Sequence, residues 1–205
     1  CKWDTIIDLE LLWGGFASAC AEHCVFVFTS QQPFTTDLIC SNKDDFRYSL
    51  VWLKEYGTNF LNANKRPLVI HEDVLCFCKM PLGRMPYNPQ GLRKASKYVK
   101  RHSMGKTVRK TSSKNKYTRE YENYPTSALK IARDIDTIHP TQKPVALLTY
   151  LIKTYTQPGE WVLDPTCGSG TTAIAAEITG RKWVCIEKDE ENYNTACDRV
   201  TRHVA

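Results

Sequence analysis

The stretch WVLDPTCGSGTTAIAA at residues 161–176 decides the fold class of this chain. Its apolar residues 161–163 predict a short buried strand. The letters GSG at 168–170 allow a tight turn that a ligand can approach closely. Thr171 and Thr172 can cap a following helix, and the small side chains after them would let that helix lie against a sheet. The pattern therefore predicts a strand, a glycine loop and a helix.

A second apolar run, WVCI at 183–186, ends at Glu187. An acidic residue at such a strand end can accept hydrogen bonds from both hydroxyls of a ribose, as in nucleotide-binding βαβ units. No GK[ST] follows the glycines, so the loop is not a phosphate-binding P-loop and suits a nucleoside ligand without phosphates. S-adenosylmethionine (SAM) is the leading candidate. The alternative is an ordinary βα turn in which the glycines serve sterics alone.

The segment HPTQKPVALLTYLIKTYTQPGE at 139–160 lies directly upstream. Apolar residues at helical spacing predict a helix over 145–155. Thr141, Gln142 and Lys143 stand at its N-terminus, where free backbone N–H groups favour an anion such as the carboxylate of SAM. A simple helix cap is the alternative, and the residues of this segment alone leave both open.

Together these segments resemble the DNA amino-methyltransferases, which modify the exocyclic amine of adenine or cytosine. HPTQKP matches the family's cofactor motif, DPTCGSGTT at 164–172 matches its glycine loop, and Glu187 matches its ribose-binding acid. The order of the motifs resembles the circularly permuted, β-type branch. The resemblance implies a Rossmann-like α/β fold with a mainly parallel sheet and SAM as cofactor. The cofactor-binding residues that it implies are His139, Pro140, Thr141, Gln142, Lys143, Asp164, Pro165, Thr166, Gly168, Ser169, Gly170, Thr171, Glu187 and Lys188.

The first half of the chain is similar to the same family. FLNANKRPLVIHEDVLCFCK at 60–79 resembles the family's FLNAxxxPxxxHE followed by a strand. Apolar spacing predicts a helix within 4–16 and strands at 24–29 and 46–54. The His-Glu pair at 71–72 lacks the second histidine of HExxH, so a structural hydrogen-bonded pair is favoured over a metal site, and we expect no metal.

The family's catalytic motif, [DNS]PP[YFW], is absent from the sequence. Either the chain begins downstream of it or the protein has lost it. We favour the first and expect the motif just before Cys1, together with a strand that feeds Trp3. MPYN at 85–88 contains a Pro-Tyr pair but follows no suitable strand, so we reject it. The catalytic residues therefore stay unknown, and the motif's letters cannot separate adenine from cytosine as the target.

Basic residues are concentrated in the middle of the chain. Residues 79–133 contain 15 Lys and Arg against two acids, while the rest of the chain has 13 basic and 20 acidic residues. A block near +13 is an electrostatic footprint for a polyanion, and the resembling family has its target-recognition region at this position. A solvated or disordered loop is the alternative. The candidate nucleic-acid-binding residues are Lys94, Lys97, Lys100, Arg101, Lys106, Arg109 and Lys110.

These patterns divide the chain into a catalytic half at 1–78, a basic insert at 79–134 and a SAM-binding half at 135–205. No apolar run is long enough for a membrane span, and no N-terminal signal peptide is visible. The nine cysteines do not pair by spacing, and the C-x3-C of Cys20 and Cys24 lacks the second pair of a zinc site. A reducing cytoplasm is the simplest setting.

The predicted function is methyl transfer from SAM to the exocyclic amine of a base flipped out of double-stranded DNA. Adenine N6 is favoured over cytosine N4 by the family resemblance alone. A non-catalytic DNA-binding protein that kept the cofactor fold is an alternative from another class. An RNA methyltransferase is a third, because phosphate attraction is blind to sequence. A restriction endonuclease partner is compatible with the resemblance, whereas no motif indicates the recognition sequence or the oligomeric state.

Overall fold

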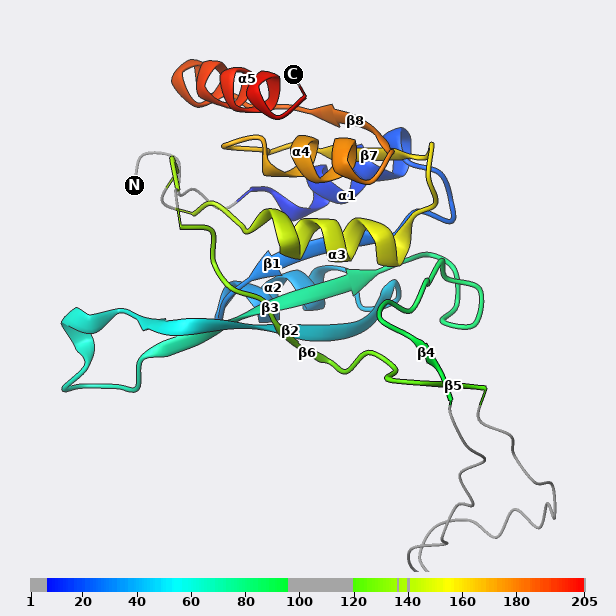
Figure 1. Ribbon diagram of the computed structural model, residues 1–205, viewed down its shortest axis with the longest axis horizontal. Coiled ribbons are helices and arrows are strands. Elements are labelled where there is room, and N and C mark those ends of the chain that lie inside the picture. Colours follow the sequence, from blue (N-terminus) through cyan, green and yellow to red (C-terminus); the bar gives the residue numbers. More distant parts are fainter. Residues whose placement is uncertain (1–6, 96–119, 136, 140, 205) are drawn as a thin grey trace, which may run out of the picture. The chain divides into compact units, whose positions relative to one another are not determined.

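The computed structural model describes residues 7–95, 120–135, 137–139 and 141–204 (Figure 1). The chain forms two compact units, one of Cys1–Asn88 with Ser127–Ala205 and one of Pro89–Thr126. The second unit is narrower than the insert expected at 79–134. Met85 is buried in the core of the first unit, and a short strand after Ser127 joins its sheet, so both flanks of the insert belong to the first unit.

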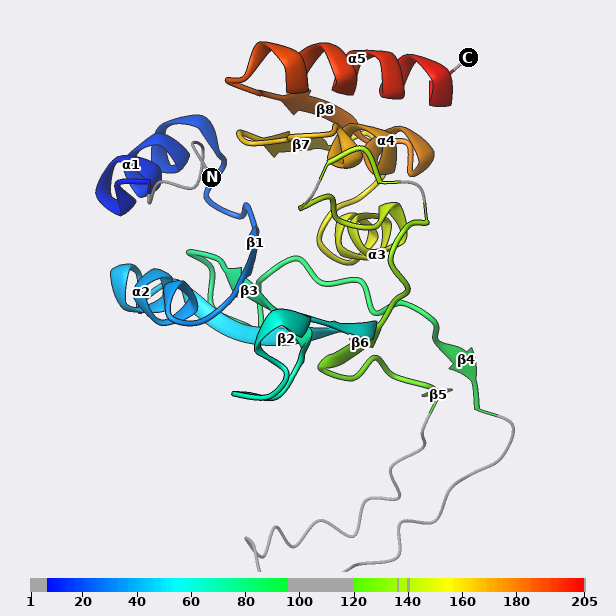
Figure 2. The same cartoon turned by 90° about the vertical axis from the view of Figure 1, so that its left-hand side faces the viewer.

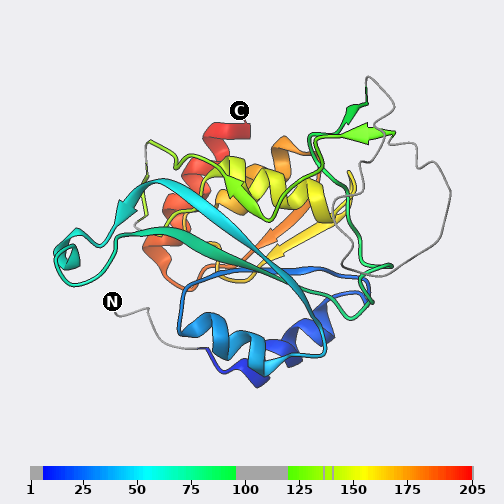
Figure 3. The ribbon, with the colours of Figure 1, turned by 90° about the horizontal axis from the view of Figure 1, so that it is seen from below.

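The first unit contains a four-stranded sheet in the order β1-β3-β2-β6. Strand β3 (Val69–Phe77) pairs antiparallel with both β1 (Phe26–Ser30) and β2 (Phe46–Thr58), and β6 (Ala128–Lys130) runs parallel to β2. Strands β2 and β3 form a long hairpin, with the 3-10 helix η1 (Phe60–Asn62) at its end (Figure 3). The N-terminal half therefore contributes mostly antiparallel pairs to a mixed α/β fold.

Helices cover both faces of this sheet (Figure 2). Helices α1 (Leu9–Ala19) and α2 (Phe34–Ser41) lie on one face, and α3 (Val145–Tyr155) lies on the other. The side chain of Asp8 accepts two backbone N–H groups of the first turn of α1, which fixes where this helix begins. The helix expected within 4–16 therefore starts and ends a few residues later than its apolar spacing suggested.

Strand β3 separates the core into two halves. Successive side chains of a strand point to opposite faces of the sheet. Leu75 and Phe77 accordingly pack with residues of α1, α2 and β1, whereas Val74 and Cys76 pack with residues of α3. The indole ring of Trp13 lies 5.0 Å from the ring centroid of Phe77 and anchors α1 on the first half.

The C-terminal part of the first unit has the expected order of strand, glycine loop, helix and strand. Strands β7 (Trp161–Asp164) and β8 (Lys182–Cys185) pair in parallel, and α4 (Thr171–Ile178) connects them. Helix α5 (Glu190–Val204) follows β8. The carboxyl ends of both strands lie side by side, because Asp164 pairs with Cys185, and the loops that follow them leave from the same edge.

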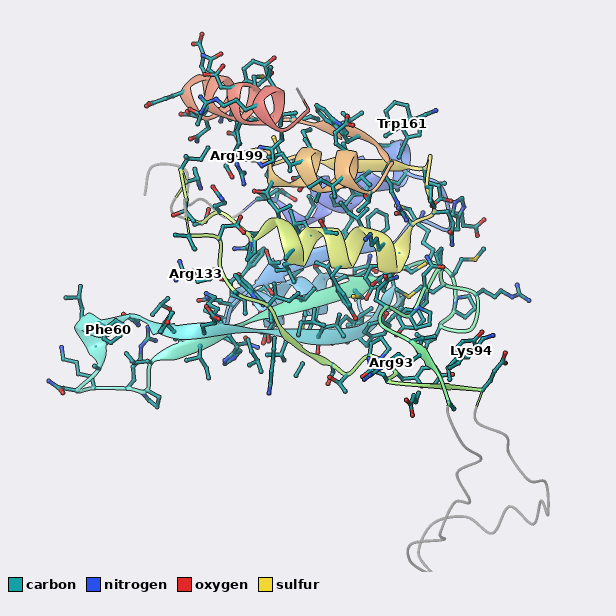
Figure 4. All side chains as sticks on the ribbon, in the orientation of Figure 1. Phe60, Arg93, Lys94, Arg133, Trp161 and Arg199 are labelled. Carbon is teal, nitrogen blue, oxygen red and sulfur yellow. The ribbon has the colours of Figure 1, made fainter. Side chains whose placement is uncertain are left out.

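One face of the β7–β8 pair is exposed, which corrects the expectation of a buried strand at residues 161–163. Trp161, labelled in Figure 4, is 65% exposed, and Val184 is 45% exposed. On the other face, Val162 and Trp183 pack against Ile152 of α3 and the small residues of α4. The two strands therefore alternate between a covered and an open face, and an apolar run alone could not distinguish this from burial on both faces.

The second unit contains a short antiparallel pair, β4 (Arg93–Lys94) and β5 (Tyr121–Glu122). The Asn123 amide donates a hydrogen bond of 2.7 Å to the carbonyl of Gly91. Residues 96–119 between the two strands lie outside the described part of the chain. No helix within the described ranges is both long and apolar enough to cross a membrane.

Candidate functional site

The glycine loop after β7 is held by side chains from inside and outside its own motif. Gly170 begins α4 with φ of +73°, a conformation that L side chains rarely adopt. Thr171 and Thr172 were expected to cap the helix, and this was wrong. The hydroxyl of Thr172 donates to Asp164 Oδ2, and that of Thr171 accepts a hydrogen bond from Arg199 Nη1 at 2.8 Å.

The two glycines of the loop serve different purposes. A Cβ added to Gly170 would come within 3.2 Å of Ala196 and Val200, so this glycine allows α5 to pack closely on the start of α4. A Cβ added to Gly168, whose φ is +51°, would meet no atom within 4 Å. The loop is therefore open at Gly168, where a ligand could approach the backbone.

Glu187 lies beside this opening. Its Oε2 atom accepts the backbone N–H of Gly168 at 2.8 Å, and its Oε1 atom accepts the N–H of Asp189 at 3.0 Å. Asp164 Oδ1 accepts the N–H of Thr166 at 3.0 Å, which fixes the first turn after β7. Two carboxylates thus hold the loop at the carboxyl ends of β7 and β8.

The HPTQKP segment is ordered by contacts within itself. The Thr141 hydroxyl lies 3.0 Å from His139 Nδ1, and Gln142 Oε1 accepts the N–H of Ile138 at 3.2 Å. Pro140 lies outside the described residues. Asp134 provides the cap of α3, because its Oδ2 atom accepts the N–H of Val145 at 3.3 Å. The alternative in which the Thr-Gln-Lys side chains simply cap the helix is therefore wrong.

Lys143 is directed towards β3. Its Nζ atom lies 3.0 Å from Glu72 Oε2, and Lys54 Nζ lies 2.6 Å from Glu72 Oε1. Burial would raise the pKa of the Glu72 carboxyl, but Lys143 and Lys54 outweigh it and lower the pKa below its ordinary value. The hydrogen-bonded pair expected between His71 and Glu72 is wrong, since the side chains of adjacent strand residues point to opposite faces of the sheet. The ion pairs instead join the HPTQKP segment to the sheet.

Arg199 on α5 was not found from the sequence. Its Nη1 atom donates to the carbonyl of Ser169 at 2.9 Å and to the hydroxyls of Ser169 and Thr171 at 3.2 and 2.8 Å. Burial lowers the pKa of the guanidinium, and Asp134 partly offsets this. A pattern that could have revealed it is the spacing of Ala196, Arg199 and Val200, which places the arginine on the packed face of the helix.

Comparison with known proteins identifies the family. The N6/N4 methyltransferase family, described as DNA methylase, matches residues 21–198. The chain belongs to this family.

Relatives and solved structures agree with this membership. The Type II methyltransferase M.BglII of Bacillus subtilis is 30% identical over 151 residues, which are 73% of this chain and 41% of M.BglII. The chain spans less than half the length of the curated relatives it matches. The M1.HpyAVI–SAM complex has a TM-score of 0.63 at 23% identity, covering 96% of this chain and 83% of that one. PvuII DNA methyltransferase, which is cytosine-N4-specific, has a TM-score of 0.62 at 15% identity, covering 95% and 74%. Both structures share the fold.

The remaining predicted site residues of this DNA methylase chain lie near the glycine loop, on β4 or outside the described residues. Pro165 is half-buried in the glycine loop, and Lys188 is exposed after Glu187. Lys94 is exposed on β4 (Figure 4), where its side chain is open to solvent. The other expected nucleic-acid-binding residues lie outside the described part of the chain; these are Lys97, Lys100, Arg101, Lys106, Arg109 and Lys110.

Other features lie outside the glycine loop and HPTQKP. A hollow beside β2, β3 and β6 is lined by residues that include Lys54, Ile70 and Lys130, none of which belongs to the glycine loop or to HPTQKP. Within the described ranges, no three His, Cys, Asp or Glu side chains are arranged to hold a metal ion. Cys20 and Cys24 are close enough for their thiols to hydrogen-bond, and burial raises the pKa of Cys24 to about 12.

Proposed function

We propose that this protein transfers a methyl group from SAM to the exocyclic amine of a base in double-stranded DNA. The observation that carries the proposal is the open backbone at Gly168 with the carboxylate of Glu187 bonded to it, in a chain of the N6/N4 DNA methylase family. An open glycine beside an acidic residue suits the ribose and backbone of a nucleoside, and no lysine of a P-loop type follows the glycines.

S-adenosylmethionine is the cofactor, and when bound it supplies an electrophilic methyl group on a sulfonium. The described residues fit it. Each Glu187 oxygen accepts one backbone N–H and keeps lone-pair capacity for a ribose hydroxyl. The loop residues would follow the nucleoside, and the HPTQKP segment would face the methionine end. Lys143 supports that segment through Glu72, so the Thr141 and Gln142 region is the better candidate for direct contact.

The protein's contribution to the reaction is orientation and electrostatics. The basic insert would neutralise DNA phosphates, and the target base would be flipped from the stack towards the cofactor. The residues that hold the amine are unassigned, because the printed sequence contains no [DNS]PP[YFW] motif. We propose the cytoplasm as the site of action because Cys76 and Cys78 serve as small buried hydrophobes in the core, a use of cysteine that suits a reducing compartment.

Adenine N6 is the proposed target, on the family resemblance alone. Cytosine N4 is the direct competitor, and the fold is shared with a cytosine-N4-specific enzyme. A partnership with a restriction endonuclease is proposed because the relative M.BglII is a Type II methyltransferase. An RNA target and a non-catalytic DNA-binding role are less favoured, because the family is described as DNA methylase.

The test is methyl transfer by the complete protein with SAM that carries a labelled methyl group. Unmethylated duplex DNA and structured RNA are offered separately, and the products are digested to nucleosides and separated by chromatography. We expect label in N6-methyladenine from DNA. Label in N4-methylcytosine would show that cytosine is the target base, and label only in RNA would show that RNA is the substrate. Binding of SAM and DNA without transfer would leave the non-catalytic role.

A further inference from the structure

Asp134 connects two parts of the candidate cofactor site that are distant in the sequence. Its Oδ2 atom accepts the backbone N–H of Val145 and the Gln142 Nε2 amide, each at 3.3 Å. The same oxygen lies 3.8 Å from Nη2 of Arg199. One carboxylate oxygen therefore holds the start of α3 and the glutamine of HPTQKP, and faces a cation that belongs to α5.

Arg199 holds the other part of the site. Its Nη1 atom makes three hydrogen bonds to Ser169 and Thr171 in the glycine loop, while Nη2 faces Asp134. The planar guanidinium presents its donors in a rigid fork, so a contact at one nitrogen fixes the direction of the other. Its side chain is only 13% exposed, and it projects from α5 (Figure 4). A lysine at this position could not reach both groups in the same geometry.

Apolar packing reaches Val145 at the start of α3, whereas the loop before α4 and the HPTQKP segment are held by polar contacts. Ile152 packs against Ala175 and Ala176 and holds the bodies of α3 and α4 together. The cofactor-facing parts, however, are the loop before α4 and the segment before α3, which are polar. A ligand that spans both needs them at a fixed separation, since a displacement of about 1 Å at a binding site is costly.

We propose that Asp134 and Arg199 form an ionic brace that sets the separation of the glycine loop from the HPTQKP segment and so preorganises the protein for SAM. The ligand in this inference rests on the proposed function. Both are positioning residues, because they act through Gln142, Val145, Ser169 and Thr171. The brace is a property of the free protein, so it can also be tested without any ligand.

The variants are Asp134→Asn, Arg199→Met, Arg199→Lys and the double variant Asp134→Asn/Arg199→Met. Calorimetry with SAM should show about tenfold weaker binding for Asp134→Asn and Arg199→Met, as is typical when a supporting charged contact is lost. The double variant should be little worse than Arg199→Met, because both changes remove one interaction. Arg199→Lys should recover only part of the affinity. With DNA as substrate, the KM for SAM should rise while kcat at saturating SAM is retained.

Two exposed neighbours on α5 provide matched controls. Asp198→Asn and Arg202→Met make the same chemical changes outside the brace and should leave SAM affinity unchanged. All binding is measured at a temperature below the thermal unfolding midpoint of each variant. Unchanged SAM affinity in Arg199→Met, or losses that multiply in the double variant, would overturn the brace.

Hydrogen exchange of the ligand-free protein separates this inference from the proposed function. In Arg199→Met, amide exchange should rise both in the glycine loop at 168–172 and at the start of α3 around Val145. Asp134→Asn should raise exchange in the same two places. A rise confined to the segment next to each substitution would refute the brace. If the wild-type protein failed to bind SAM, the proposed function would be refuted, and the exchange pattern would still decide whether the brace exists.

Discussion

Gly168 and Glu187 are joined by a hydrogen bond of 2.8 Å from the glycine N–H to the carboxylate Oε2 atom. The bond crosses from the loop after β7 to the end of β8. Because Cys167 N–H also donates to the carbonyl of Ile186 at 3.0 Å, the loop and the strand end form one rigid corner. A ligand that meets Gly168 therefore meets the Glu187 carboxylate in a geometry set before binding, which is how such a corner could contribute affinity.

Replacing Glu187 should therefore weaken SAM binding. Glu187→Ala removes a charged acceptor and frees the Gly168 N–H, and we expect a loss on the order of 1.5–3 kcal/mol. Glu187→Gln keeps one acceptor oxygen and should lose less. Calorimetry measures both. Glu190→Ala, which removes a nearby exposed carboxylate, should bind SAM like wild type. Unchanged affinity in a folded Glu187→Ala variant would contradict the role of this residue.

The Glu72 ion pairs predict an acid-dependent stability. The pKa of Glu72 is lowered in the folded state. The ion pairs therefore contribute their full stabilisation above the pKa of the unfolded chain, and this stabilisation is lost as the pH falls through the pKa of the folded protein. Glu72→Gln should destabilise more than Lys143→Met, because it leaves the buried Lys54 ammonium without a counter-charge. Urea unfolding from neutral to acidic pH measures this.

In the Glu72→Gln variant, the acid-dependent part of the stability should be missing. Glu55→Gln is the matched control, since this exposed glutamate belongs to the strand that carries Lys54. A Glu72→Gln variant that loses stability towards acid as steeply as wild type does would show that the two lysines do not depend on this carboxylate.

The local elements from β7 to β8 could be predicted because their causes are local. The glycines, the apolar runs and the acidic strand end are adjacent in the sequence, and they gave the order of strand, loop, helix and strand. The role of Thr172 could not be predicted in this way. Its hydroxyl bonds Asp164, on the strand before the loop, and only the folded turn brings the two together.

Long-range polar contacts could not be predicted from the sequence for the same reason. Asp134 and Arg199 are 65 positions apart, and neither lies in a motif. The sequence predicts a pair of Glu72 with its neighbour His71, whereas the ion-pair partners of Glu72 come from β2 and from HPTQKP. Strand β6 has three residues, which is too short for a periodic pattern to indicate, and it exists because it pairs with β2.

Cys167 should be more reactive than the buried thiols. A hydrogen bond with Cys185 lowers the pKa of Cys167, whereas burial raises the pKa of Cys76 to about 11. The thiolate is the reactive form, so iodoacetamide near neutral pH should modify Cys167 well before Cys76. SAM should slow the reaction because Cys167 adjoins the open Gly168. Peptide mass spectrometry over time measures both rates.

The exposed Cys40 provides the reference in that experiment, since SAM should not alter its rate of modification. Cys167→Ser should abolish the SAM-sensitive label while the label on Cys40 is retained. Equal rates at Cys167 and Cys76, or a rate at Cys167 that does not change at saturating SAM, would show that this thiol does not report on ligand binding at the glycine loop.

The basic insert should give DNA binding a steep salt dependence. Each neutralised phosphate contributes a slope of about 0.9 log units of affinity per log unit of salt. Replacing Lys94, Lys97, Lys100 and Arg101 with alanine should therefore flatten the slope by up to about 3.6 and weaken binding to all duplex sequences alike. SAM affinity should survive, because the glycine loop and HPTQKP belong to the other compact unit. Fluorescence anisotropy from low to moderate salt measures the slope.

A control variant must remove positive charge without touching the insert, because lower net charge alone reduces attraction to DNA. Lys43→Ala/Arg202→Ala changes two exposed cations in the first unit and is compared with Lys94→Ala/Lys97→Ala in the insert. If the insert contacts phosphates, only Lys94→Ala/Lys97→Ala should lower the salt slope of DNA binding, by up to about 1.8. Equal slopes for the insert variants and wild type would remove these residues from the DNA interface, whereas equal losses in both pairs would assign the effect to net charge.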